Sequence, residues 1–166
     1  MREFFYVITL KYYCGMKHLN YERTSFGVHY MPDDGEAGVI LPELVFRQIY
    51  IEQVKEFSQS CHITFGTKNM PVVLYYNLRP NEPLAQNEFV YLLTLRVHSQ
   101  SPKANYEQTA TGFLQRKESE LLMPETAFKR IYKEQSLRLS QDCNFDLGGA
   151  NMPSVLCYHL MPNEPL

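Results

Sequence analysis

Cysteine and histidine are the residues of this chain whose type and spacing come closest to nucleophilic chemistry. Cys61 is followed directly by His62, and His159 lies further along the chain. Because a thiolate forms near neutral pH only beside a base or a positive charge, these residues would suit a cysteine-dependent enzyme or a small-ligand site between the two halves of the chain. Cys143, however, is followed by Asn144, and we expect Cys61 and Cys143 to be small buried side chains. We therefore predict no catalytic residue and no enzyme.

Metal ligands do not occur at their usual spacing. The remaining histidines, His18, His29 and His98, are isolated, and the chain contains neither a Cys-x-x-Cys nor a His-x-x-x-His motif. The sequence therefore predicts neither a metal site nor a cofactor.

The four cysteines indicate free thiols in a reducing compartment. Cys61 and Cys143 occupy equivalent positions in the two halves, whereas Cys14 and Cys157 have no cysteine counterpart. A chain of 166 residues with 45% hydrophobic residues can bury a core without disulfides. A bridge between Cys14 and Cys157, or between two chains, is the alternative.

The apolar segment near the start of the sequence is interpreted as a strand. Residues 4–10 superficially resemble a signal peptide, but the pattern recurs at residues 89–95. No apolar run is long enough to span a bilayer. We expect a cytoplasmic protein that does not associate with membranes.

The two halves of the chain resemble each other in sequence. The closest match joins residues 69–84 to residues 151–166, and about 33 of roughly 79 paired positions are identical over the full alignment. We interpret the chain as a tandem duplication with domains at residues 1–84 and 85–166. The connector at residues 81–87 is short and lacks Gly and Ser, which predicts two rigidly packed repeats.

Each repeat has the pattern of an α+β unit, in the order strand, strand, helix, strand. Alternating apolar residues identify the strands. We expect strands at residues 4–12, 24–31 and 72–78, and at residues 89–97 and 109–115 of the second repeat. Loops are expected at residues 14–22 and 99–107, and a further short strand at residues 61–65.

Proline begins the predicted helix of each repeat. Pro42 and Pro124 suit the first helical position, and each is followed by a glutamate that favours the positive end of the helix dipole. The side chains expected to face the sheet recur at helical spacing; in the first repeat they are Phe46, Ile49, Tyr50, Gln53 and Phe57. One helix should therefore cover one face of an antiparallel or mixed sheet.

The order of hairpin, helix and returning strand resembles the ubiquitin-like β-grasp roll. That resemblance implies a last strand beside the first. Residues 73–76 followed by residues 80–83 are also similar to the Val-Leu-Phe-Phe and Pro-Asn-Glu-Leu segments that end small uncharacterised bacterial proteins. The second resemblance implies no activity, and a ferredoxin-like packing is the alternative fold.

Aromatic residues are frequent, with 12 Tyr and 10 Phe. Strand aromatics can stack single-stranded bases, and the candidates are Tyr6, Tyr12, Tyr13, Tyr75 and Tyr76. The formal charge of -2 and the lack of a basic run disfavour nucleic acid. Tyrosine also suits protein interfaces, so we expect a protein-binding or self-associating surface.

An Asn-Tyr-Glu triad occurs at the same position of both repeats, as Asn20, Tyr21, Glu22 and as Asn105, Tyr106, Glu107. Presenting the same contact twice would raise avidity for a partner. In the alternative interpretation, the tyrosine fills the end of its own core. We predict that these six residues bind a protein partner, and that the chain is a non-enzymatic interaction or regulatory module that can also form a homo-oligomer.

Overall fold

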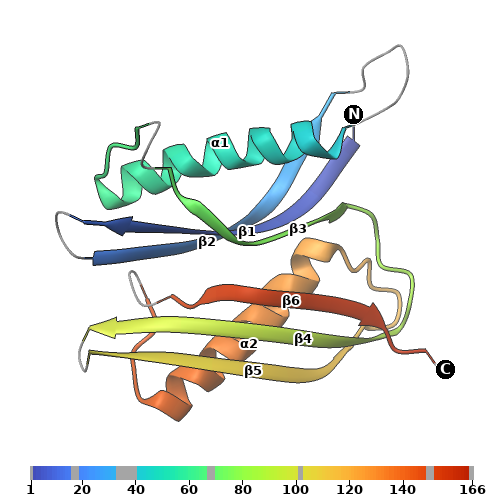
Figure 1. The fold of residues 1–166 in the computed structure, drawn as a ribbon. Coiled ribbons are helices and arrows are strands. Elements are labelled where there is room, and N and C mark those ends of the chain that lie inside the picture. Colours follow the sequence, from blue (N-terminus) through green and yellow to red (C-terminus); the bar gives the residue numbers. More distant parts are fainter. Residues whose placement is uncertain are drawn as a thin grey trace. The chain divides into compact units, whose positions relative to one another are not determined.

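The computed structural model forms two compact units, unit 1 at Met1–Pro80 and unit 2 at Asn81–Leu166 (Figure 1). It describes residues 2–15, 19–32, 41–66, 70–100, 103–148 and 152–164. Residues 81–84, which the sequence comparison assigns to the first repeat, belong to unit 2. There the Leu84 amide donates a hydrogen bond to the Leu122 carbonyl oxygen at 2.8 Å.

Unit 1 is an antiparallel three-stranded sheet with a helix packed on one face. Its elements are β1 (Arg2–Cys14), β2 (Leu19–Met31), α1 (Pro42–Cys61) and β3 (Val72–Pro80). The strand order is β2-β1-β3, so the last strand lies beside the first, as expected, and runs antiparallel to it. The register shifts between Thr9 and Leu10, which leaves Leu74 of β3 as a bulge.

Unit 2 has the same order of elements and the same sheet. Its elements are β4 (Glu88–Gln100), β5 (Lys103–Gln115), α2 (Pro124–Cys143) and β6 (Ser154–Pro162). The strand order is β5-β4-β6, with all pairs antiparallel. A register shift between Thr94 and Leu95 leaves Leu156 as a bulge, at the position equivalent to Leu74. The α+β class predicted from the sequence is confirmed for both units.

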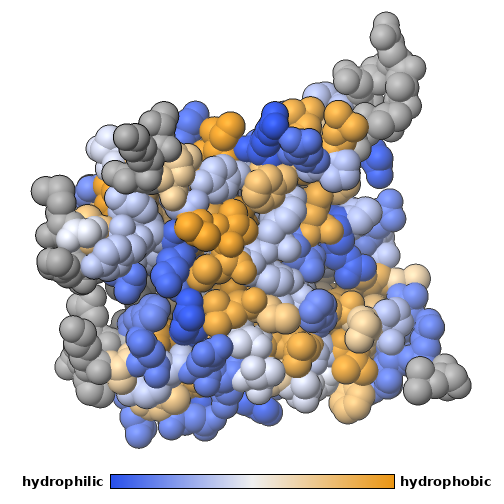
Figure 2. Space-filling view, viewed as in Figure 1, coloured by the Kyte–Doolittle hydropathy of each residue, from blue (hydrophilic) through white to orange (hydrophobic). Residues whose placement is uncertain are grey.

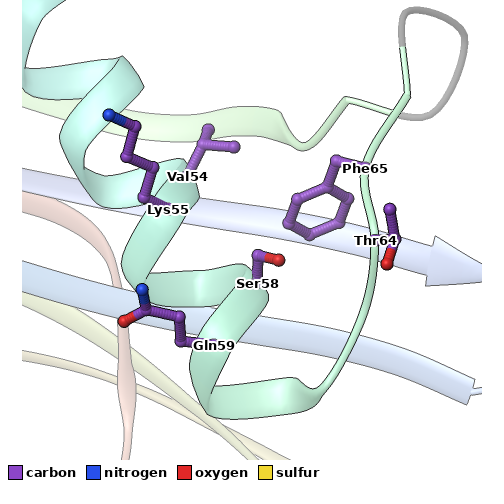
Figure 3. A pocket seen from close by; sticks show the side chains of 6 residues that line it. All are labelled: Val54, Lys55, Ser58, Gln59, Thr64 and Phe65. Carbon is purple, nitrogen blue, oxygen red and sulfur yellow. The ribbon is translucent and has the colours of Figure 1, made fainter.

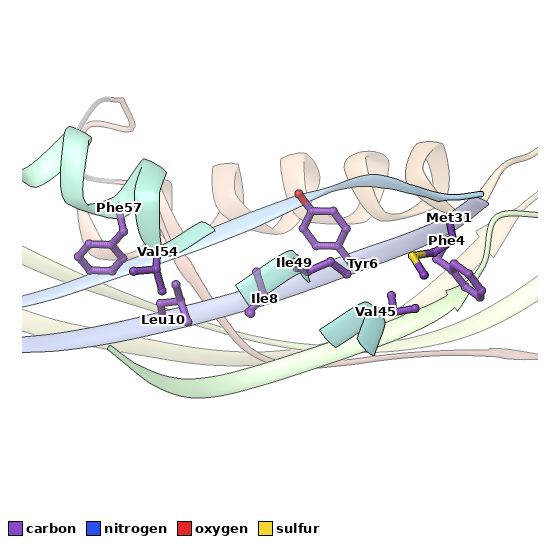
Figure 4. Packing of buried hydrophobic residues seen from close by; sticks show 9 residues of the cluster. All are labelled: Phe4, Tyr6, Ile8, Leu10, Met31, Val45, Ile49, Val54 and Phe57. Carbon is purple, nitrogen blue, oxygen red and sulfur yellow. The ribbon is translucent and has the colours of Figure 1, made fainter. Parts of the chain in front are cut away.

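The core of unit 1 lies between β1 and α1. Successive strand residues point to opposite faces of a sheet, so every second residue of β1 faces the helix. Figure 4 shows the buried cluster, which consists of Phe4, Tyr6, Ile8, Leu10, Met31, Val45, Ile49, Val54 and Phe57. The helical stripe predicted from the sequence supplies Ile49 and Phe57, and Val45 and Val54 lie beside it. The helix therefore covers one sheet face, as predicted.

The helix ends follow from local sequence. Pro42 and Pro124 occupy the first turns of α1 and α2, where their missing amide proton breaks no helical hydrogen bond. Both helices end at a residue in the left-handed region, His62 with φ of 54° and Asn144 with φ of 53°. The amide of each donates to the carbonyl oxygen of an equivalent serine, Ser58 or Ser140.

Three expected elements are wrong. The described residues of the loops expected at residues 14–22 and 99–107 are largely strand, because β2 and β5 begin at Leu19 and Lys103 and extend the hairpins. The short strand expected at residues 61–65 does not form. Cys61 is the last helical residue, and the backbone turns at His62.

None of the described helices is long and apolar enough to cross a membrane.

Candidate interaction site

The two Asn-Tyr-Glu triads lie on the edge strands β2 and β5. Because side chains alternate along a strand, the tyrosine of each triad points to the helix of its own unit. The asparagine and the glutamate point to the opposite side of the sheet, which we call the outer face. The structure thus divides each triad between two environments.

The triad tyrosines are core side chains. Tyr21 is paired with Tyr12 across the hairpin, and both pack against the buried cluster of unit 1. In unit 2 the ring of Tyr106 stacks on Phe145, with centroids 5.9 Å apart and an interplanar angle of 10°. These contacts support the interpretation that each tyrosine fills the end of its own core. The asparagines and glutamates are left to form the surface.

A polar row on the outer face of unit 1 contains the triad residues. Going along β2, Asn20, Glu22 and Thr24 lie directly opposite Tyr13, Lys11 and Thr9 of β1. The hydroxyl oxygens of Thr9 and Thr24 are 2.8 Å apart, so they form a hydrogen bond. Glu22 and Lys11 place opposite charges in directly facing positions, an arrangement that stabilises a strand pair.

Unit 2 carries an equivalent polar row. Along β5, Asn105, Glu107 and Thr109 lie opposite His98, Arg96 and Thr94 of β4. The Thr94 and Thr109 hydroxyl oxygens are again 2.8 Å apart. A hydrogen bond also joins His98 Nδ1 to Asn105 Oδ1. The row therefore repeats the threonine pair, the acid opposite a base and the terminal asparagine.

Apolar side chains occupy part of the remaining outer face of each unit, and they differ in exposure between the units. In unit 1, Phe5 and Val7 of β1 are almost fully buried. In unit 2, Val90 lies between Phe113 and Met161, which are 66% and 59% exposed. Figure 2 shows hydrophobic residues gathered among hydrophilic ones on the visible surface. Exposed aromatic and methionine side chains next to polar ones are typical of protein interfaces.

Cys61 and His62 lie in different environments. Cys61 ends α1 and packs against the core of unit 1, while His62 is the exposed helix cap. Burial raises the pKa of the Cys61 thiol, although the Arg23 guanidinium acts in the opposite direction. A raised pKa lowers the thiolate fraction at neutral pH. His159, the other candidate, is an exposed side chain of β6 in unit 2.

All four cysteines are free thiols. Among the described residues, no three histidine, cysteine, aspartate or glutamate side chains are placed to hold a metal ion.

A shallow pocket of about 290 Å³ lies between the C-terminal part of α1 and the segment that follows it (Figure 3). It is lined by Val54, Lys55, Ser58, Gln59, Thr64 and Phe65. Lys55 is the charged residue of this lining, and the Ser58 hydroxyl donates a hydrogen bond to the Ile63 carbonyl oxygen. The lining includes neither Cys61 nor His62, so the pocket does not support a thiol-dependent site.

The tyrosines proposed as base-stacking residues are divided between the two faces of the sheet. Tyr6, Tyr12 and Tyr76 face α1 and belong to the core or pack against it. Tyr13, which is 55% exposed, and Tyr75 lie on the outer face. The outer face therefore carries two of the five candidates, which is a poor stacking platform.

A buried hydrogen bond in each unit is a feature that the sequence analysis missed. Gln53 Nε2 donates to Tyr6 Oη at 2.8 Å, and Gln135 Nε2 donates to Tyr91 Oη at 2.7 Å. The glutamine inside the apolar stripe of each helix could have indicated this bond, because a buried polar group needs a hydrogen-bond partner.

A glycine of the edge strand makes room for each buried tyrosine. An ideal Cβ at Gly27 would lie 3.4 Å from Tyr6 Oη, and one at Gly112 would lie 2.6 Å from Tyr91 Oη. The tyrosine, the glutamine and the glycine are identical in the two halves of the chain. These shared residues therefore serve the fold.

Comparisons with models of protein families, with curated proteins and with solved structures find no match.

Proposed function

We propose that the protein is a non-enzymatic interaction module made of two tandem copies of one ββαβ unit, and that the polar rows of its outer faces bind a protein partner. The observation that carries the proposal is the repetition of the rows. An asparagine, a glutamate and a threonine occupy the same register of β2 and of β5, whereas the tyrosine between them is used by the core.

The tandem duplication is supported by equivalent contacts in the two units. Tyr50 Oη donates to the Pro71 carbonyl oxygen at 2.7 Å, and Tyr132 Oη donates to the Pro153 carbonyl oxygen at 2.6 Å. Each of these bonds ties the helix to the segment before the last strand. Unrelated sequences on a common fold would have no reason to share such side-chain contacts, the bulges and the helix caps.

The asparagines and glutamates of the polar rows are accessible to a partner. Asn20, Asn105 and Glu107 are exposed, and Glu22 is half-buried. Amide and carboxylate groups at such positions can form hydrogen bonds that fix orientation, and exposed apolar residues further along the same outer face, such as Phe113, can supply buried area. Two equivalent surfaces on one chain would raise the avidity for a partner that itself repeats the matching surface.

The charge of the rows favours a protein over a nucleic acid. Each row contains one acid and one base in facing positions, Glu22 with Lys11 and Glu107 with Arg96. Such a surface has no positive excess to attract phosphate groups. The partly buried thiol of Cys61, with its raised pKa, likewise supports a non-enzymatic role.

The test replaces the triad residues that face outwards and leaves the core tyrosines unchanged. The variant carries Asn20→Ala, Glu22→Ala, Asn105→Ala and Glu107→Ala. A matched control carries Glu52→Ala and Glu134→Ala, which are also shared by both halves and exposed, but on the helices. All proteins are first shown to melt at similar temperatures.

Affinity capture from cells of the source organism, with quantitative mass spectrometry, then compares the three proteins. We expect a partner that the wild type and the control capture equally and that the outer-face variant loses by about tenfold or more, as expected for loss of several interface hydrogen bonds. A partner captured equally by all three proteins would contradict the proposed site.

A further inference from the structure

Strand β6 has one open edge. It pairs with β4, and no other described strand pairs with it. The edge of a sheet presents backbone amide and carbonyl groups that can hydrogen-bond another strand. Proteins usually protect such an edge with charged residues, prolines or a covering element.

The direction of the β6 amides follows from one hydrogen bond. The Asn163 amide donates to the Glu88 carbonyl oxygen of β4 at 2.9 Å. In an antiparallel ladder, residues alternate between pairs that exchange hydrogen bonds and pairs that do not. The amides of Met161 and His159 therefore also point to β4.

The residues between them point their backbone groups outwards. Leu160 and Tyr158 present their amides and carbonyl groups to the open edge by the same alternation. Pro162 also occupies an outward position, where its missing amide proton costs no bond to β4. The bulge at Leu156 interrupts the regular ladder, so the regular edge runs over residues 157–162.

Charge protects the other edge strands but not β6. The sequence of β6 contains no Asp, Glu, Lys or Arg between Ser154 and Pro162. By contrast, β5 contains Glu107, β2 contains Glu22 and Arg23, and β3 contains Arg79. Of these edges, that of β6 is the one on which a second strand would meet no charged residue.

We propose that β6 pairs antiparallel with β6 of a second copy of this chain, so that two sheets of unit 2 become one continuous sheet. This inference does not depend on the proposed function. A second β6 offers a matching row of backbone donors and acceptors, and a two-fold axis brings the same edge of both chains together. Both strands are already ordered by β4, so pairing costs less conformational entropy than binding a flexible peptide.

The size of the resulting sheet also supports pairing with a second copy of the chain. Two three-stranded sheets joined at this edge give a sheet of ordinary size. The short regular edge limits the contact area, and small interfaces are usually weak. We therefore expect a dimer with a dissociation constant on the order of micromolar.

Hydrogen exchange of the wild-type protein tests the strand assignment directly. Amide exchange is measured by nuclear magnetic resonance at concentrations well below and well above the expected dissociation constant. We expect the Leu160 and Tyr158 amides to become at least tenfold more protected at high concentration, while Met161 and His159 are protected at both. Equal protection of Leu160 and Tyr158 at all concentrations would overturn the proposal.

Charge placed on β6 provides the second test. In one variant, His159→Lys and Met161→Lys put like charges on both paired edges, where they repel. The control carries Thr111→Lys and Gln115→Lys on β5, which are exposed on the same outer face and lie outside the polar row. Sedimentation equilibrium should show the dissociation constant rising at least tenfold for the β6 variant alone.

Three results of that experiment would reject edge pairing. The first is a wild-type protein that stays monomeric at millimolar concentration. The second is a dimer that the β6 lysines leave unchanged. The third is a dimer weakened equally by the β5 lysines, which would place the contact on the outer face instead of the edge.

Discussion

Units 1 and 2 make equivalent contacts, but the side chains at these contacts are packed more closely in unit 2. A Cβ added to the glycine beside the buried tyrosine would lie 3.4 Å from the tyrosine hydroxyl oxygen in unit 1 but 2.6 Å from it in unit 2. Phe128 is fully buried, whereas the equivalent Phe46 is half-buried. Identical residues at equivalent positions therefore contribute differently to stability, and the difference can be measured one pair at a time.

The largest difference is expected for the phenylalanine pair. Phe128 stacks on Tyr132 at 5.6 Å and meets Tyr158 edge-on at 5.0 Å. Phe128→Ala should lower the free energy of unfolding by about 3–5 kcal/mol, because it leaves a cavity in a closed core. Phe46→Ala should cost about 2 kcal/mol, since solvent already reaches that ring. Urea denaturation of both variants, followed by circular dichroism, measures the difference, and equal losses would show that burial does not rank these sites.

The glycine pair should show the next largest difference. Gly112→Ala forces the Tyr91 ring away from Gln135 and breaks a buried hydrogen bond, which we expect to cost about 2–3 kcal/mol. Gly27→Ala needs a shift of a few tenths of an ångström and loses less backbone entropy on folding, so its net effect should be within about 1 kcal/mol of zero. Thermal melting of the two variants measures the two losses of stability. A larger loss for Gly27→Ala than for Gly112→Ala would show that Tyr91 moves freely.

Alkaline pH should destabilise both units through partly buried tyrosines. Burial raises the pKa of Tyr76 and of Tyr132 from 10.0 to about 12. The pKa of each tyrosine is higher in the folded state than in the unfolded state. Each neutral tyrosine therefore contributes its full stability below pH 10, and this contribution is lost as the pH rises towards 12. Tyr76→Phe and Tyr132→Phe should each reduce the loss of stability over this range.

The same two variants should differ at neutral pH. Tyr76 Oη is buried without a hydrogen-bond partner among the described residues, so Tyr76→Phe should leave stability unchanged or slightly raised. Tyr132→Phe removes the donor to the Pro153 carbonyl oxygen and should cost about 1 kcal/mol. Urea denaturation at pH 7 and across the alkaline range measures both effects. A similar cost for the two variants at pH 7 would contradict the assignment.

The smallest difference is expected at the helix caps. His62 and Asn144 both hold a left-handed backbone, which asparagine tolerates better than histidine. His62→Gly should therefore stabilise unit 1 by about 1 kcal/mol, and Asn144→Gly should stabilise unit 2 by about half as much. Melting temperatures would measure this pair, and destabilisation by either glycine would mean that the cap side chain makes a needed contact.

Helices and central strands were predictable because their hydrophobic pattern is regular. Both helices begin at the predicted prolines, and β1 and β4 contain the predicted strands. The edge strand β2 was partly missed because it carries polar residues on both faces. Arg23 points to the helix side, where it binds Glu56 at 3.3 Å and the Ser60 hydroxyl at 2.9 Å. A charged residue on the helix side interrupts the apolar alternation, so the sequence pattern there predicts a loop and not a strand.

The expected strand at residues 61–65 failed for a different reason. Ile63 and Phe65 alternate with polar residues, as in a strand. Phe65 instead packs edge-on against Tyr12 at 4.8 Å and against Phe57 at 5.7 Å, and no described strand pairs with it. The alternation of apolar and polar residues here therefore reflects tertiary packing of Phe65 and not a strand.

The position of the candidate site was predictable, but its orientation was not. Repetition of Asn-Tyr-Glu identified the six residues, yet only strand pairing shows that Tyr21 and Tyr106 point inwards. The order of elements and the place of β3 beside β1 agree with the expectation, and β3 runs antiparallel to β1. The resemblance to the β-grasp roll itself stays a prediction. It does not assign a function.

The separation of paired strands along the chain also has a consequence for folding. β4 and β5 are adjacent in sequence and pair along 13 residues each, whereas β6 joins β4 only after α2 has been made. Local contacts close faster than distant ones, so the hairpin should form first and β6 should dock last. During synthesis, the strand without charged residues would then be the last to be sheltered, and slow docking would make β6 the segment most exposed to aggregation.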